Sequence, residues 1–244
     1  MIARRALLAA GLGAAALLAG CASGLRPAEP MVAPYDRMQL WAVVPPRNES
    51  GTSLVDPLVV ADELQREAEQ VVGVRTVPVN RVVQAMRELD LPVIDSAFAA
   101  RTLMVELGLD ALVTGTVTAY DPYRPMTFGL ALDLHVRPAL AAGPGALDPR
   151  TLEWSVRGAE SVGETGPAGP AAQASAVFRA SDHRTLKWVS EYADHRSEPE
   201  SAFGDEIYLV SMKHFLRFAC HRLLLDLLDQ ERMRLAAASV RPPT

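Results

Sequence analysis

The sequence predicts a single two-layer α/β domain with α+β character, in which helices cover a mixed β-sheet. Three observations predict this fold class. Short apolar runs alternate with amphipathic segments early in the chain, an order typical of crossover connections. From residue 111 the hydrophobic period changes from helical to alternating, as in antiparallel strands. A long apolar stretch near the C-terminus has the pattern of a helix that packs across a sheet.

The first elements are expected in the order strand, helix, strand. Residues 40–44 form a short apolar run that two prolines stop, which predicts a buried strand. Asp56 stands before a proline, a placement that suits the N-cap of a helix, and Gly73 is placed to end that helix. Residues 74–77 form the second predicted strand. The sheet is therefore expected to start with α/β crossovers.

Two further helices and an antiparallel hairpin follow. Asn80 and Asp95 are the expected N-caps of the helices, and Gly108 is expected to close the second one. Residues 111–120 alternate threonines with small apolar residues, and residues 127–137 place large apolar side chains opposite polar ones. A short turn separates these two segments, so they predict a hairpin.

The remaining elements are a second hairpin and a long helix. Residues 174–180 and 186–192 are predicted to pair as antiparallel strands across a polar turn. Between the hairpins, residues 139–173 are rich in Gly, Pro and Ala, which predicts a long mobile loop. Residues 205–235 predict one helix with a wide apolar face.

The N-terminus has the features of a bacterial signal peptide. Arg4 and Arg5 form a charged start, and residues 6–18 form an apolar stretch too short for a stable transmembrane helix. The stretch ends in a tetrapeptide that resembles the lipobox of bacterial lipoproteins, Leu18, Ala19, Gly20 and Cys21. That resemblance implies cleavage before Cys21 and acylation of this residue, including with palmitate. Ala22 and Ser23 follow, rather than an Asp that would favour retention in the inner membrane, so the outer membrane is expected, facing the periplasm.

Charge and cysteine content narrow the expected ligands. Loss of Arg4 and Arg5 on cleavage would change the formal net charge from −5 to −7. An acidic mature chain argues against nucleic acid or anionic lipid as the main ligand. With a lipid on Cys21, Cys220 has no partner for an intramolecular disulfide, and its apolar surroundings predict a buried thiol. No cofactor is expected beyond the covalent lipid.

Several strings of the mature chain resemble one group of envelope proteins. They are residues 41–48 (WAVVPPRN), 110–117 (DALVTGTV), 120–123 (YDPY) and 177–182 (VFRASD). They resemble periplasmic lipoproteins grouped around the curli secretion component (CsgG-like), the penicillin-binding-protein activator (LpoB-like) and the amino-terminal domain of TolB. The resemblance implies a mixed α/β domain and a non-enzymatic role in envelope assembly or export, and it supplies no catalytic residue.

These observations predict the division of the chain. A lipoprotein signal peptide covers residues 1–20, a lipidated tether covers 21–38, and the CsgG/LpoB/TolB-like domain covers 39–236. The domain contains the insertion at 139–173, and residues 237–244 are predicted to be a disordered tail.

Catalytic chemistry finds little support in the sequence. The mature chain contains no nucleophile elbow, phosphate loop or zinc-protease motif. Asp133 and His135 project from the same face of one predicted strand, but two ligands do not make a zinc site, and no metal is assigned. His214, Arg217 and His221 form one stripe on the long helix, for which a solvated face is the favoured interpretation over an acidic partner or a pH response.

The loop at residues 45–54 is the candidate for partner binding. It contains the polar residues Arg47, Asn48, Glu49 and Ser50. It leaves the first strand and enters a helix N-terminus, where ligands of open α/β sheets often bind. A connection whose side chains satisfy its own backbone is the favoured alternative.

The predicted function is that of a non-catalytic, outer-membrane-anchored lipoprotein that binds other envelope proteins. A homo-oligomer is compatible with this prediction. An oligomeric CsgG-like secretion channel is the first alternative, although only one long strand carries the required alternation. A metal-dependent hydrolase is the weaker alternative.

Overall fold

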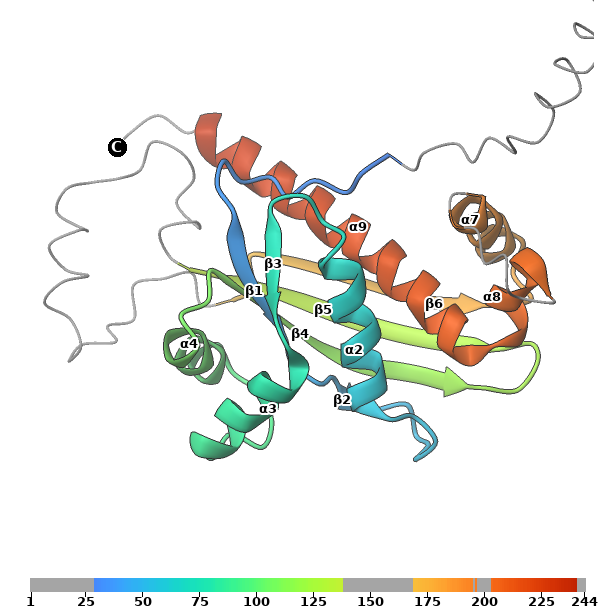
Figure 1. Ribbon diagram of the computed structural model, residues 1–244, viewed down its shortest axis with the longest axis horizontal. Helices are drawn as coiled ribbons and strands as arrows, with labels where there is room; N and C mark the ends of the chain where they lie inside the picture. The colour runs from blue at the N-terminus through green and yellow to red at the C-terminus, as the bar shows by residue number, and fades with distance from the viewer. Residues whose placement is uncertain (1–28, 138–168, 195, 197–202, 241–244) are drawn as a thin grey trace, which may run out of the picture.

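The computed structural model describes residues 29–137, 169–194, 196 and 203–240, and a mixed sheet of six strands forms its centre (Figure 1). The strands are β1 (Gln39–Val43), β2 (Arg47–Asn48), β3 (Val74–Val77), β4 (Ala111–Asp121), β5 (Thr127–Val136) and β6 (Ala172–Arg179). The sheet order is β3-β1-β4-β5-β6, and β2 also pairs with β4. The predicted fold class, a mixed sheet covered by helices, is confirmed.

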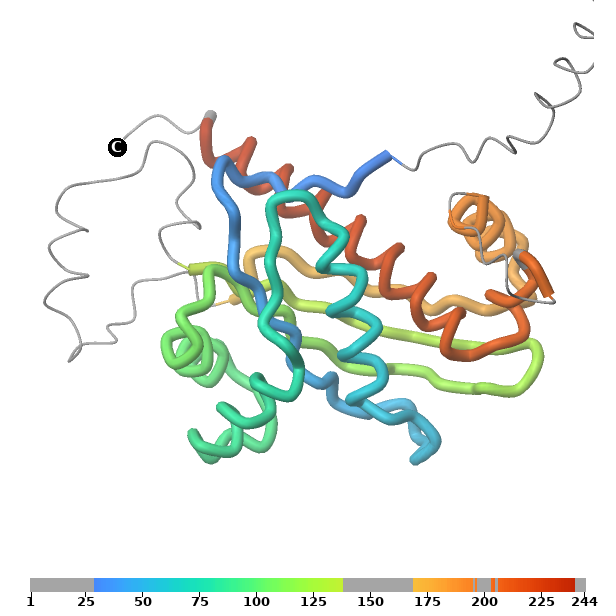
Figure 2. The backbone as a smooth tube through the Cα atoms, in the orientation of Figure 1, coloured from blue at the N-terminus to red at the C-terminus, as the bar shows by residue number. Residues whose placement is uncertain are grey.

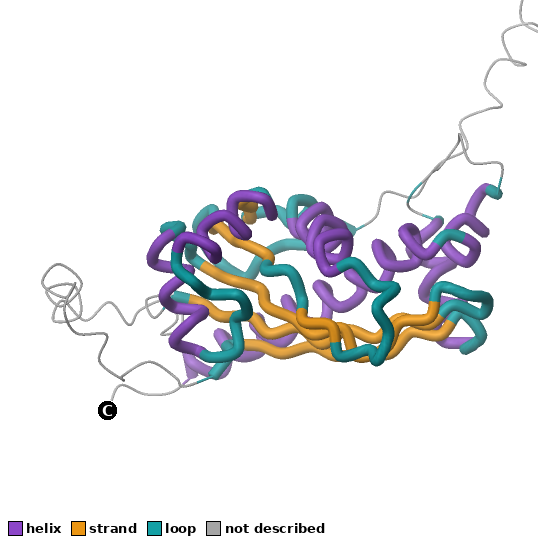
Figure 3. Tube along the Cα trace, turned by 90° about the horizontal axis from the view of Figure 1, so that it is seen from below, coloured by secondary structure: helices purple, strands orange, loops and turns teal. Residues whose placement is uncertain are grey.

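Strand direction changes twice across the sheet, because β5 runs opposite to its neighbours β4 and β6. β1 runs parallel to both β3 and β4, which the crossover helices require. β4 and β5 form the predicted hairpin, with Leu112 opposite His135 and Tyr120 opposite Phe128. β6 then pairs antiparallel with β5 although the chain between them is long. Figure 3 shows the strands as one continuous layer.

Helices cover both faces of this layer. They are α2 (Pro57–Ala68), α3 (Val79–Glu88), α4 (Ala97–Glu106), α7 (His183–Ala193), α8 (Ile207–Val210) and α9 (Met212–Val240), with a 3-10 turn at Gly204–Glu206. One apolar cluster joins α2, α7 and α9 to one face of the sheet, and a second joins α3 and α4 to the other face. In Figure 1 α9 crosses the sheet obliquely, with α3 and α4 towards one end and α7 and α8 towards the other. Within the part of the chain that the structure describes, no helix is long and apolar enough to cross a membrane.

The domain begins earlier than the predicted boundary at residue 39. Met31 and Ala33 are buried, and Val32 bridges Val72 in parallel. The Tyr35 hydroxyl donates a hydrogen bond of 2.8 Å to Glu231 Oε1 on α9. Figure 2 shows this segment running beside the C-terminal part of α9. Residues 31–38 therefore belong to the folded domain, because the side chains of Met31 and Ala33 are buried and Tyr35 is bonded to α9.

The second predicted hairpin is wrong in its second half. Residues 172–179 are indeed a strand, but residues 186–192 lie within α7. The buried side chains of α7 are Thr185, Val189, Tyr192 and Ala193, which share one helical face. A window this short fits both an alternating and a helical pattern, and the burial of this helical face in the core selects the helix.

Several helix ends differ from the predicted ones. The Asp56 cap is confirmed, since Asp56 Oδ1 accepts from the Leu58 amide at 2.9 Å. The second helix starts at Val79 after Pro78, not at an Asn80 cap, because the proline already ends the strand and presets the backbone. Ser96, not Asp95, caps α4 through a 3.2 Å bond from the Ala99 amide.

The long C-terminal helix also differs in its bounds. Ser211 has extended dihedral angles, φ −115° and ψ 116°, so the predicted single helix is broken between α8 and α9. α9 then continues to Val240, past the predicted domain end at residue 236. Of the predicted insertion, residues 139–168 lie outside the described residues, as do the predicted signal peptide and Cys21.

The core on the side of α2 and α9 is filled by large apolar side chains and one cysteine. Large side chains such as Trp41, Phe128 and Phe218 are fully buried on the side of α2 and α9. Cys220 lies among them as a free, fully buried thiol, which confirms that prediction, and burial raises the pKa of this thiol. On β5, Gly129 faces the irregular pairing between Val117 and Ala119 of β4, where the strands approach too closely for a side chain.

We predict that Gly129→Ala lowers the free energy of unfolding by about 1–3 kcal/mol, the usual cost of inserting a methyl group into a filled space. The added Cβ would lie 2.5 Å from Thr118 Oγ1 and 3.0 Å from the Ala119 amide nitrogen. Urea unfolding measures the change. Gly169→Ala is the control, because its Cβ meets nothing within 4 Å. Equal urea midpoints for the two variants would contradict the prediction.

Candidate functional site

A layer of buried charges lies between α2 and α9. Glu63 and Glu67 of α2 are 1% and 0% exposed, and the two residues lie one turn apart on one helix face. Arg217 and His221 of α9 have the same spacing. Arg217 Nε donates to Glu63 Oε2 at 3.0 Å, and His221 Nδ1 lies 2.9 Å from Glu67 Oε2. The two helices are thus joined by an ion pair and a histidine–carboxylate hydrogen bond in matching register.

The end of α7 joins the same layer. The Tyr192 hydroxyl donates to Glu67 Oε1 at 3.1 Å, and Arg196 Nη2 donates to Glu67 Oε2 at 3.0 Å. The Arg196 guanidinium lies 3.9 Å from the centre of the Tyr192 ring and also donates to Gln70 Oε1 at 2.8 Å. Burial, and then the negative charge of Glu67, raises the pKa of Tyr192, so this hydroxyl stays a donor. Glu67 of α2 therefore contacts both α9 and the C-terminal end of α7.

The polar stripe predicted on α9 is not the solvated face that the sequence favoured. Arg217 and His221 point toward α2, with side-chain exposures of only 16% and 19%. His214 instead lies 2.8 Å from Ser211 Oγ at the start of α9. The missed signal was in α2, where Glu63 and Glu67 interrupt an otherwise apolar helix face and so require cationic partners.

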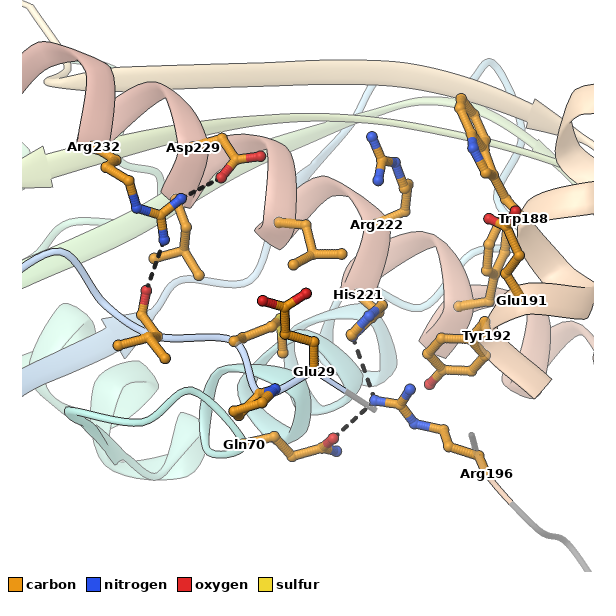
Figure 4. Close-up of a pocket in the computed structure, with 16 residues that line it drawn as sticks. Glu29, Gln70, Trp188, Glu191, Tyr192, Arg196, His221, Arg222, Asp229 and Arg232 are labelled. Atoms are coloured by element: carbon orange, nitrogen blue, oxygen red, sulfur yellow. Dashed lines mark hydrogen bonds and ion pairs between the residues drawn. The ribbon is translucent and has the colours of Figure 1, made fainter. Parts of the chain in front are cut away.

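A cleft opens beside this layer, between α7, α9 and residues 29–32, and is called the α7–α9 cleft below (Figure 4). Its volume is about 710 Å³. The apolar part of its lining comprises Met31, Trp188, Phe218, Leu225 and Leu228. No motif in the sequence pointed to this cleft, because its walls come from three segments that are far apart in the chain.

Arginine side chains provide the cationic part of the cleft. The Arg222 guanidinium lies 4.9 Å from the Trp188 ring centre, and its Nη2 donates to Asp226 Oδ1 at 2.7 Å. Burial raises the pKa of Asp226, an effect that Arg222 opposes. Further along α9, Arg232 pairs with Asp229 and donates to the Val32 carbonyl, as Figure 4 shows.

A second, smaller cavity lies on the other side of the sheet. It has a volume of about 180 Å³ and brings together Arg47 of β2, Thr114 of β4, and Asp133 and His135 of β5. His135 Nε2 lies 3.3 Å from Thr114 Oγ1, and Gln173 Nε2 donates to Asp133 Oδ1 at 2.6 Å. Burial lowers the pKa of His135, while Asp133 opposes this shift, so the imidazole is neutral near pH 7.

The four candidate partner-binding residues lie on and just after β2, and one of them, Arg47, lines this cavity. Arg47 and Glu49 form an exposed ion pair of 3.4 Å. Asn48 Nδ2 donates to the Thr52 carbonyl at 2.7 Å, and the Ser50 hydroxyl donates to Asn48 Oδ1 at 2.6 Å. Asn48 and Ser50 thus shape the loop, whereas Arg47 and Glu49 face outward. Partner binding by these residues remains a prediction.

The described part of the chain contains no cluster of side chains that could hold a metal ion. No group of three or more His, Cys, Asp or Glu side chains there is arranged to hold an ion. Asp133 and His135 lie together as predicted but have no third ligand among the described residues.

Comparison with known proteins finds distant structural likeness. No protein-family model matches the chain, and no curated protein matches it. The lipoprotein GNA1162 from Neisseria meningitidis is 18% identical, with 63% of this chain and 92% of that chain covered and a TM-score of 0.36. The LpoB C-terminal domain from Salmonella enterica is 16% identical over 46% of this chain and 78% of that chain, with a TM-score of 0.33. A PelC dodecamer from Paraburkholderia phytofirmans is 11% identical over 83% of this chain and 93% of that chain, with a TM-score of 0.33.

We predict unequal effects for the two α9 cations that reach Glu63. Arg217→Ala is expected to lower the free energy of unfolding by about 3–5 kcal/mol, because a buried carboxylate loses its closest partner. Lys213→Ala is expected to cost at most about 1 kcal/mol, because Lys213 is 58% exposed and 3.8 Å from the carboxylate. Urea midpoints of the two variants make the comparison. Similar losses would show that the buried layer does not depend on Arg217.

Proposed function

We propose that this protein is an outer-membrane-anchored lipoprotein of the periplasm that binds protein partners in envelope assembly or export, without catalysis. One observation carries the proposal, the tetrapeptide at residues 18–21 where the apolar part of the signal peptide ends. A cysteine in this context receives more than one acyl chain. A single chain binds membranes only marginally, whereas several chains give stable attachment.

The N-terminal segment supports a short connection between anchor and body. Met31 and Ala33 are buried, and Tyr35 is bonded to α9, so the chain is held from residue 31 onward. Residues 22–28 separate the acylated Cys21 from Glu29, the first described residue. The eight residue-to-residue steps from Cys21 to Glu29 span at most about 29 Å when the chain is fully extended. The domain is therefore held close to the membrane surface.

The state of the buried titratable groups supports binding over catalysis. Glu63 and Glu67 are the most buried carboxylates of the α2–α9 layer, and arginine, histidine or tyrosine side chains already contact their oxygens. Groups that compensate each other in this way stabilise the fold and leave no free base for a reacting molecule. Arg47 and Glu49, by contrast, are about half exposed and lie beside a cavity, as a polar contact surface requires.

We predict that Cys21→Ser leaves unprocessed precursor and abolishes palmitate labelling. The physical reason is that a hydroxyl does not replace the thiol as the acyl acceptor. Metabolic labelling and the mobility of the protein on denaturing gels measure both effects. Cys220→Ser is the matched control, because that thiol is buried in the core and is expected to play no part in lipidation. Normal processing of the Cys21 variant would refute the lipid anchor.

We predict that a photo-crosslinking residue in place of Glu49 captures a specific envelope protein in living cells. Glu49 is exposed and its side chain bonds only to Arg47 among the described residues, so the replacement leaves the fold intact. Glu88, an exposed residue on α3, is the control position. Mass spectrometry identifies the captured protein. Recovery of the protein without cross-linked partners, or of the same proteins from both positions, would count against partner binding at this loop.

A further inference from the structure

The α7–α9 cleft has the composition of a binding site for a molecule with one apolar and one anionic part. Its volume of about 710 Å³ lies in the range of small-molecule sites. Trp188 forms one wall, and Leu225 and Leu228 of α9 form another. Trp188 is held in place by edge contact with Phe178, at 6.4 Å between ring centres. The cleft therefore offers a fixed apolar surface.

Arg222 lines the cleft beside this surface, and most of its N–H groups make no hydrogen bond to the described residues. Its side chain is 33% exposed, and within the described part of the chain it makes one hydrogen bond, from Nη2 to Asp226. Its Nε is buried and has no acceptor among the described residues. A guanidinium carries five N–H groups in a fork that fits a carboxylate or phosphate, so most of the binding capacity of Arg222 is unused.

The acidic residues of the cleft lie at its rim. Glu191 and Asp229 have side-chain exposures of 57% and 65%, and Glu29 is also exposed. Water screens these carboxylates, whereas the partly buried Arg222 is screened less. The closest carboxylate, Asp226, is 38% exposed and takes one N–H group of Arg222 at 2.7 Å. An anionic group inside the cleft is therefore held by hydrogen bonds from the remaining N–H groups of Arg222 rather than by a net positive charge.

The position of the cleft determines which molecule is most available to it. Residues 29–32 form part of its wall, and these are the first described residues after the proposed lipid anchor. We infer that the α7–α9 cleft binds an anionic amphiphile, with the hydrocarbon chain against Trp188 and Leu225 and the head group on Arg222. Fatty acids and anionic phospholipids share this chemistry. The inference rests on the proposed function only for the closeness of the cleft to the membrane.

Quenching of Trp188 by brominated lipid tests this inference, because bromine quenches indole fluorescence only near contact. The mature lipoprotein is placed in phosphatidylcholine vesicles that contain dibromostearate, dibrominated phosphatidylglycerol or dibrominated phosphatidylcholine. We predict quenching by one or both anionic probes and not by the zwitterionic one. The anionic probe that quenches identifies the head group. Trp188→Phe should remove the quenching, which separates Trp188 from the other two tryptophans.

Two variants test the assigned contacts. Arg222→Gln should weaken binding of the anionic probe about tenfold, the effect of losing one charge-assisted hydrogen bond. Arg184→Gln is the matched control, because Arg184 also lies over the Trp188 ring, at 5.8 Å, but does not line the cleft. Leu225→Phe narrows the cleft while it retains Arg222 and adds no second indole, and should reduce quenching. Urea unfolding verifies that each variant is folded.

The outcomes separate this inference from the lipid anchor. Equal quenching by all three probes would show that Trp188 merely touches the bilayer, and would overturn the inference. If the protein floats with the vesicles but is not quenched, the lipid anchor stands and the inference about the cleft is overturned. If the protein does not float, the anchor fails, and dibromostearate in solution then decides the inference by quenching Trp188 or leaving it unchanged.

Discussion

Two carboxylates without access to solvent, Glu63 and Glu67, determine how the helices are arranged over the sheet. A buried charge without a partner costs several kcal/mol, so α2 packs against a helix that supplies hydrogen-bonding or cationic side chains at the same spacing. Arg217 and His221 on α9 meet this requirement. A shift of α9 by one turn would separate both pairs at once. The apolar faces of the two helices are compatible with several alignments, and the charged layer selects one.

The α7–α9 cleft lies beside this charged layer. The C-terminal end of α7 is held to Glu67 through Tyr192 and Arg196, which are polar contacts of fixed geometry. At its middle, α7 is held by Trp188, whose ring meets Phe178 on β6. These polar contacts and the ring contact of Tyr192 with Phe218, at 5.8 Å between centres, together position α7, and space remains between α7 and α9 beside Trp188. The proposed binding surface thus lies next to the compensated buried charge.

The N-terminal segment and the loop after β1 give the domain two separate polar regions. Tyr35 bonds to Glu231, which also accepts from Arg234, so the entering chain is fixed on the outer half of α9. The α7–α9 cleft lies on that side. The smaller cavity beside Arg47 is lined by β2, α4, β4 and β5 and shares no residue with the cleft. Attachment to a membrane and contact with a protein partner therefore need not compete for one surface.

The sequence by itself determined the strands and helices with strong periodicity, because their patterns are local. The alternation along residues 127–137 and the Asp56 cap are such cases, and both appear as predicted. Residues 186–192 did not, since seven residues fit two periods and only the burial of Val189, Tyr192 and Ala193 on one face identifies a helix. The roles of Arg217 and His221 were decided by the tertiary structure alone. Their partners, Glu63 and Glu67, each lie 154 positions away in the chain, and no local sequence pattern indicates a contact at that separation.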